Sequence, residues 1–179
     1  MIYFYTAQSY GKLSELDSAL VYANKCLLIE PKMKQVLTMR SYTYRLMNRY
    51  SDAANDLKTA NLLHPNDKEI QFMIGSLEIR FNNLEEGEKH IDSALEFDDS
   101  YVDALEAKAF SEIKKGNYVE AKNICKRMIN IEPTFALSYS NLGYIEAISG
   151  DTLTGIKNVR KAIEMSPKDP YMHKWLGEI

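Results

Sequence analysis

The chain has 179 residues, 45% of them hydrophobic and 26% charged, which is the balance of an ordinary soluble globular protein. The formal net charge of −3 gives no general case for binding nucleic acid or an anionic membrane. No run of about 18 apolar residues is present to span a membrane. The start at Met1 lacks the basic residues and apolar run of a signal peptide. We therefore expect a cytoplasmic protein.

A sequence repeat with a period of 34 residues runs through the chain. Residues 31 and 65 are 34 apart, 65 and 133 are 68 apart, and 133 and 167 are 34 apart; these positions hold Pro31, Pro65, Pro133 and Pro167, and Asp99 takes the remaining place. Two further columns hold almost only small residues: Ala7, Ser41, Gly75, Ala109 and Gly143 in one, and Ala19, Ala53, Gly87, Ala121 and Gly155 in the other. Small side chains let two helices approach closely. A period of this length indicates stacked helix pairs.

This pattern resembles the tetratricopeptide repeat. With the proline column as repeat position 32, the best match places an aromatic residue, Leu-Gly, Ala and Pro where the family has them, at Tyr139, Leu142, Gly143, Ala162 and Pro167. Departures occur at position 7, with Arg40 and Lys108, and at position 11, with Glu78, Glu112 and Glu146. The resemblance implies an all-α fold, a right-handed superhelical solenoid of antiparallel helix pairs, each made of a helix A and a helix B.

We expect one array over residues 1–179. Its repeats cover about 1–33, 34–67, 68–101, 102–135 and 136–169, and residues 170–179 form a partial sixth unit or a capping helix. Asp169-Pro170 supports this last helix, because proline is favoured at the first helical position. Since Met1 falls inside the first expected helix, we expect the chain to be a piece of a longer protein.

Helix boundaries follow from capping signals in chain order. The first helix should cover residues 2–13, and Ser14 with Asp17 predicts a capping box before a helix that ends near Pro31. Asn48 should close the first helix of the second repeat. The capping box is expected again at Asn66–Glu69, Asn83–Glu86, Ser100–Asp103 and Asn117–Glu120. Each cap should contribute about 1 kcal/mol.

The sequence holds no credible catalytic, metal or cofactor site, so we expect no enzyme. The histidines His64, His90 and His173 have no second ligand at metal spacing. The position 11 glutamates could form an acid–base row, but pairing with neighbours such as Lys108 is the favoured interpretation. Cys26 and Cys125 are too far apart to bridge and are expected in the core.

The resemblance also implies where a partner would bind. In the family, the A helices line a concave groove through positions 2, 5, 9, 12 and 13. The residues expected there combine aromatic and polar side chains, as peptide-binding surfaces do: Phe4, Gln8, Tyr42, Arg45, Phe72, Ser76, Arg80, Phe110, Asn141 and Tyr144. The alternative is that some of these aromatics pack between neighbouring A helices.

The family pattern excludes one specific ligand. Repeats that bind the acidic tails of chaperones use a two-carboxylate clamp of Lys, Asn and Arg, and no frame of this chain supplies it; the frame from the first repeat offers Phe4, Gln8, Met39, Glu69 and Met73. We expect a non-catalytic scaffold that binds a peptide or helix of another protein. The alternatives are self-association through Tyr171, Trp175 and Leu176, giving a homodimer through terminal helices, or a regulatory region of a larger protein.

Overall fold

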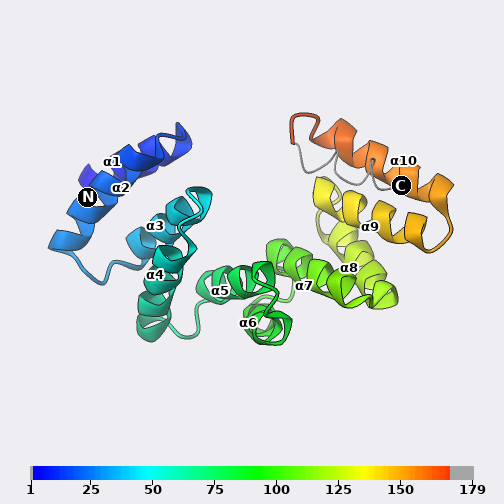
Figure 1. The fold of residues 1–179 in the computed structure, drawn as a ribbon, viewed down its shortest axis with the longest axis horizontal. Coiled ribbons are helices and arrows are strands. Elements are labelled where there is room, and N and C mark those ends of the chain that lie inside the picture. The colour runs from blue at the N-terminus through cyan, green and yellow to red at the C-terminus, as the bar shows by residue number, and fades with distance from the viewer. Residues whose placement is uncertain (1, 170–179) are drawn as a thin grey trace.

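A computed structural model describes residues 2–169, and these residues form ten helices and no strands. The chain curves into an open arc, with α1 and α2 at one end, α5 to α7 in the middle, and α9 and α10 at the other end (Figure 1). The helices are α1 Ile2–Lys12, α2 Leu16–Ile29, α3 Lys34–Leu46, α4 Tyr50–Leu63, α5 Lys68–Arg80, α6 Leu84–Phe97, α7 Val102–Lys115, α8 Tyr118–Ile131, α9 Ala136–Ile148 and α10 Thr152–Met165.

Each odd-numbered helix is the helix A of a pair, and the following even-numbered helix is its helix B. Every helix packs against the next one along the chain, and α1 also contacts α3, α5 contacts α7, and α7 contacts α9. The expected all-α solenoid is thus confirmed. None of the helices within residues 2–169 has both the length and the apolar character that crossing a bilayer requires.

The two small-residue columns mark where helix A crosses helix B in each repeat. Where the column holds serine, the Ser41 hydroxyl donates a hydrogen bond of 3.1 Å to the Ala53 carbonyl of the facing helix. Where both columns hold glycine, the backbones are closer still. A methyl group added at Gly75 would lie 2.7 Å from the Gly87 carbonyl oxygen, and one at Gly155 would lie 2.6 Å from that of Gly143. Close approach therefore explains these paired glycines.

The core consists of apolar clusters between successive helices. The largest lies between α7, α8 and α9 and is centred on Leu105, Met128 and Ile145. Both cysteines are buried and unbridged, as expected: Cys26 belongs to the cluster of the first repeat and Cys125 to that of the fourth. Burial raises the pKa of the Cys125 thiol to about 12, so this thiol is protonated at neutral pH.

Three of the turns between helix A and helix B depend on a polar residue in the left-handed conformation. Asn48 has φ of 58°, as expected for the residue that closes α3, and Asn82 has φ of 66° after α5. Ser14 has φ of 60° and belongs to the same class. Its predicted capping box with Asp17 is therefore wrong: Glu15 precedes α2 and makes no side-chain capping bond.

Most of the other predicted capping boxes are also wrong in detail. Before α5 the cap is Asp67, not Asn66, and Asp67 accepts hydrogen bonds from the backbone N–H groups of Glu69 and Ile70. The residue that precedes α7 is Tyr101, whose side chain makes no capping hydrogen bond. The Ser100 hydroxyl donates a hydrogen bond to Asp98 instead of capping the helix.

Asn83 and Asn117 do precede α6 and α8, but their side chains turn back to helix A. The Asn83 amide donates to Glu78 at 2.7 Å, and the Asn117 amide donates to Glu112 at 2.7 Å. Two glutamates of position 11 therefore bind the start of the next helix. This contact supports the structural interpretation of that column.

Charged residues at position 7 link neighbouring helices. Arg40 forms a two-pronged ion pair with Asp56 of α4, at 2.8 and 2.6 Å, and also donates to Asn24 of α2. Lys108 pairs with Asp92 of α6 at 2.5 Å, so it bonds a neighbour in the stack rather than Glu112. Arg40 and Lys108 thus replace the family's leucine by ion pairs between helices.

Candidate partner-binding groove

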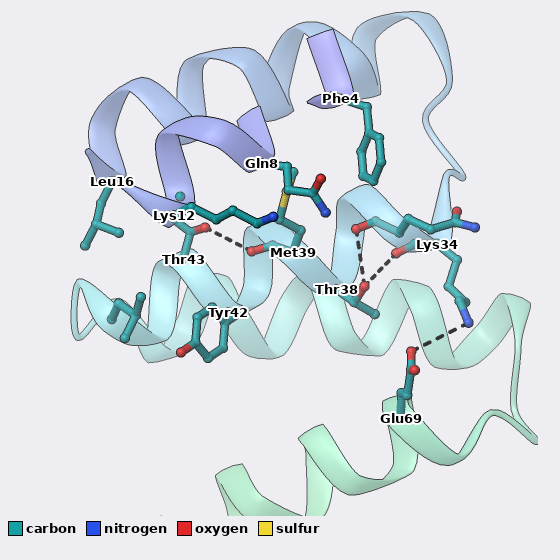
Figure 2. Close-up of a pocket in the computed structure, with 13 residues that line it drawn as sticks. Phe4, Gln8, Lys12, Leu16, Lys34, Thr38, Met39, Tyr42, Thr43 and Glu69 are labelled. Atoms are coloured by element: carbon teal, nitrogen blue, oxygen red, sulfur yellow. Dashed lines mark hydrogen bonds and ion pairs between the residues drawn. The ribbon is translucent and has the colours of Figure 1, made fainter. Parts of the chain in front are cut away.

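A cavity of about 570 Å³ opens between α1 and α3. Phe4 and Gln8 reach into it from α1, and Thr38 and Tyr42 face it from α3 (Figure 2). Glu69 of α5 approaches the Lys34 ammonium group to 3.9 Å at its edge. The exposed lining is mainly apolar, and polar side chains such as Gln8 and Thr38 also face the cavity.

Two further cavities continue this space along the A helices. One of about 540 Å³ lies between α3, α5 and the start of α7, and it shares Tyr42 and Glu69 with the first. Another of about 290 Å³ lies farther along between α3, α5 and α7, and it shares Arg45 and Phe72 with the second. We call these three adjoining cavities the groove. It is lined almost entirely by A helices.

Most of the residues expected to bind a partner line this groove. The first cavity has Phe4, Gln8 and Tyr42, the second has Tyr42, Arg45 and Phe72, and the third has Arg45, Phe72, Ser76, Arg80 and Phe110. Asn141 and Tyr144 of α9 line none of the three. Asn141 is fully buried beside Glu106, and Tyr144 packs against the core cluster of α7 to α9. Tyr171, Trp175 and Leu176 lie outside the described residues.

The groove aromatics divide between partner surface and core. Tyr42 has 53% of its surface exposed. Phe72 and Phe110 are partly buried against the cluster of α5 to α7, and the Phe72 ring meets that of Tyr101 edge to face at 5.3 Å. Tyr42 is therefore available to a partner, whereas the two phenylalanines also hold helices together.

The charged residues that line the third cavity are three cations, Arg45, Arg80 and Lys114, and one carboxyl group, that of Glu106. Burial, together with the charge of Arg80, lowers the pKa of the Arg45 guanidinium from its usual range. Burial raises the pKa of the Glu106 carboxyl to about 7. Ser76 lines the same cavity, and its buried hydroxyl has no hydrogen-bond partner among residues 2–169.

The potential metal ligands and titratable side chains of the described residues mostly bond one another. No group of three or more potential ligands there is placed to hold a metal ion. Asp98 bonds Lys68 and Ser100. The ring of His90 bonds the Gln71 side chain at 2.6 Å, so it links α6 to α5.

Several groove residues were not selected from the sequence. Glu69 and Asp103 occupy repeat position 2, which the family pattern already assigns to the groove. Their place in the groove could therefore have been predicted from that position. Lys34, Met39 and Tyr101 lie at other positions. The family pattern does not assign those positions to the groove.

Solved structures with this arrangement of helices are numerous. A tetratricopeptide repeat protein from Parabacteroides merdae is 22% identical with a TM-score of 0.84, over 98% of this chain and 69% of that one. PilW, a type IV pilus biogenesis factor, is 20% identical with a TM-score of 0.84, over 98% and 85%. YrrB, described as having an unusual peptide-binding site, is 16% identical with a TM-score of 0.67, over 99% and 91%.

These likenesses concern the fold. No protein-family model matches the sequence, and no curated protein matches it. The 34-residue period, the helix pairs and the similarity to solved repeat proteins nevertheless agree with one another. The chain therefore has the tetratricopeptide repeat fold.

Proposed function

We propose that the protein is a non-catalytic scaffold that binds an extended or helical segment of another protein in the groove. The observation that supports this most is the continuity of three cavities along α1, α3, α5 and α7. Proteins of this fold serve in general as interaction scaffolds, and YrrB is described as a peptide-binding member. The exposed Tyr42 ring, shared by two cavities, is the aromatic anchor of the proposed site.

A displayed random-peptide library, selected on the immobilised protein, supplies ligands for the test. The affinity of the selected peptides is then measured by fluorescence polarisation for the original chain and for Tyr42→Ala. We expect Tyr42→Ala to weaken binding about tenfold or more, because truncating an aromatic anchor commonly costs over 1 kcal/mol.

The matched control is Leu62→Ala on α4, a side chain that is 77% exposed and lines none of the three cavities. It should leave the affinity unchanged. Loss of binding in Leu62→Ala with none in Tyr42→Ala would place the peptide on the B helices and refute the proposal.

Self-association is a second candidate, favoured by the outer face of α1. Ile2 and Tyr5 on that helix are 80% and 56% exposed, and an exposed apolar patch favours association between protein chains. Light scattering behind a sizing column should then show a dimer for the original chain and a monomer for Ile2→Ser with Tyr5→Ser. A monomer for the original chain at every concentration would refute self-association.

A further inference from the structure

Three cations from successive A helices lie along one stretch of the groove. Arg45 is in the last turn of α3, Arg80 ends α5, and Lys114 is in the last turn of α7. The last turn of a helix favours cations because of the helix dipole. All three line the third cavity, so the stacking of equivalent helices gathers them together. We call Arg45, Arg80 and Lys114 the basic row.

The basic row differs from the cations that connect the helices. Arg40, Lys68, Lys108 and Lys115 each form an ion pair with a carboxylate of a neighbouring helix. Within residues 2–169 no member of the basic row forms such a pair. Instead, the Arg80 guanidinium lies over the Tyr50 ring at 4.9 Å, and the Lys114 ammonium group donates to the Ile79 carbonyl at 3.2 Å.

Arg45 is the most unusual of the three, because it is partly buried and still lacks a carboxylate partner. A buried cation is normally paired, since removing it from water is costly. Ser76 lines the same cavity, and its hydroxyl is buried with no hydrogen-bond partner among residues 2–169. The carboxyl group that lines this cavity, Glu106, is itself held partly neutral by burial.

We infer that the groove takes an acidic segment of a partner protein, and that the basic row holds an aspartate or glutamate side chain of that segment. This inference rests on the proposed groove function. The flanking residues of the segment are apolar, because Phe72 and Phe110 form the walls beside the row. Nucleic acid fits less well, because Glu69 and Asp103 line the adjoining cavity and the net charge is −3.

The test uses two pools of fluorescein-labelled dodecapeptides measured by fluorescence polarisation. One pool is randomised among Asp, Glu, Leu, Phe and Gly, and the other has Asn and Gln in place of the acids. We expect the original chain to bind the acidic pool at least about tenfold more tightly than the amide pool, because hydrogen bonds between charged groups are stronger than neutral ones. Arg45→Gln with Arg80→Gln should abolish that difference.

The matched control is Lys126→Gln with Arg160→Gln, which removes the same charge from exposed positions on α8 and α10 outside the three cavities. It should keep the preference for the acidic pool. If circular dichroism shows that the Arg45→Gln with Arg80→Gln variant has lost helix, Arg80→Gln alone provides the test, because this exposed side chain can be replaced without disturbing the core. It should reduce the preference about fivefold.

The outcomes separate this inference from the proposed function. Equal binding of both pools, or an unchanged preference in the Arg80→Gln variant, would overturn the role of the basic row and leave peptide binding in place. Failure of both pools to bind would overturn both proposals. Tighter binding of a labelled single-stranded oligonucleotide than of the acidic pool would overturn the assignment of the partner as an acidic protein segment.

Discussion

The glycine pair at the crossing of α5 and α6 gives a prediction that the structure makes quantitative. In Gly87→Ala, the added methyl group would lie 2.6 Å from the Ile79 Cγ1 atom, 2.9 Å from the Gly75 carbonyl oxygen and 3.0 Å from the Ile79 backbone nitrogen. Two of these are backbone atoms, so the helices must move apart. Overpacking of this kind costs about 1–3 kcal/mol. Alanine recovers up to about 1 kcal/mol of helix propensity.

Because two backbone contacts place the overpacking cost near the upper end of that range, about 3 kcal/mol, and alanine recovers about 1 kcal/mol, we expect Gly87→Ala to lower the free energy of unfolding by about 2 kcal/mol. Urea unfolding followed by far-UV circular dichroism measures the change. Gly11→Ala is the matched control, because nothing lies within 4 Å of the added methyl group and its backbone is helical. This control should be neutral or more stable by up to about 1 kcal/mol. Equal stabilisation by both variants would refute close approach as the reason for Gly87.

Three further predictions concern an ion pair between helices, a helix cap and a buried carboxyl group. Asp56→Ala should cost about 2–4 kcal/mol in urea unfolding, because it leaves Arg40 partly buried and unpaired; Arg40→Leu in the same chain should recover most of the loss. Asp67→Ala should cost about 1–2 kcal/mol and Asn66→Ala almost nothing, because only Asp67 accepts the first N–H groups of α5. Glu106 should lower stability by about 1–3 kcal/mol as pH rises from its ordinary 4.5 to its folded pKa of about 7, because ionisation is penalised only in the folded state; Glu106→Gln should flatten this pH profile.

The fold could be predicted from the sequence because its cause is periodic. Helices that cross at the same place in every repeat need a small residue there each time. Ala53 and Gly87 are two such residues, at the same repeat position in successive repeats. The burial of both cysteines could be predicted for the same reason, because each stands at an inward position of a helix B. Because the pattern occurs five times, a single residue that departs from it, such as Arg40, does not obscure it.

The capping bonds could not be predicted, because the turn geometry decides them. Left-handed residues precede the cap position in several of these turns, but the capping bond differs among them: after Gly150, Asp151 accepts from the Thr154 N–H, whereas Asn83, after Asn82, makes no capping bond. The Asn83 amide instead donates to Glu78 of helix A. The local sequence of a capping box is the same whether or not this happens.

The groove was only partly predictable from the sequence. Repeat position predicts which residues face the concave side. It does not predict which of these aromatics also pack against neighbouring helices, as Phe72 does. Phe72 and Tyr42 both stand at groove positions of a helix A, and of these two side chains only Tyr42 is more than half exposed. Asn141 of α9 is fully buried beside Glu106 of α7.

The central claim is that a partner segment lies along the A helices, and site-specific photo-crosslinking tests it most directly. Benzoylphenylalanine replaces Tyr42 in one variant and Leu62 in another, and each is irradiated with the same display-selected peptide before mass spectrometry. The groove account predicts a peptide adduct at position 42 and none at position 62. An adduct at position 62 alone would contradict it and place the binding surface on the B helices.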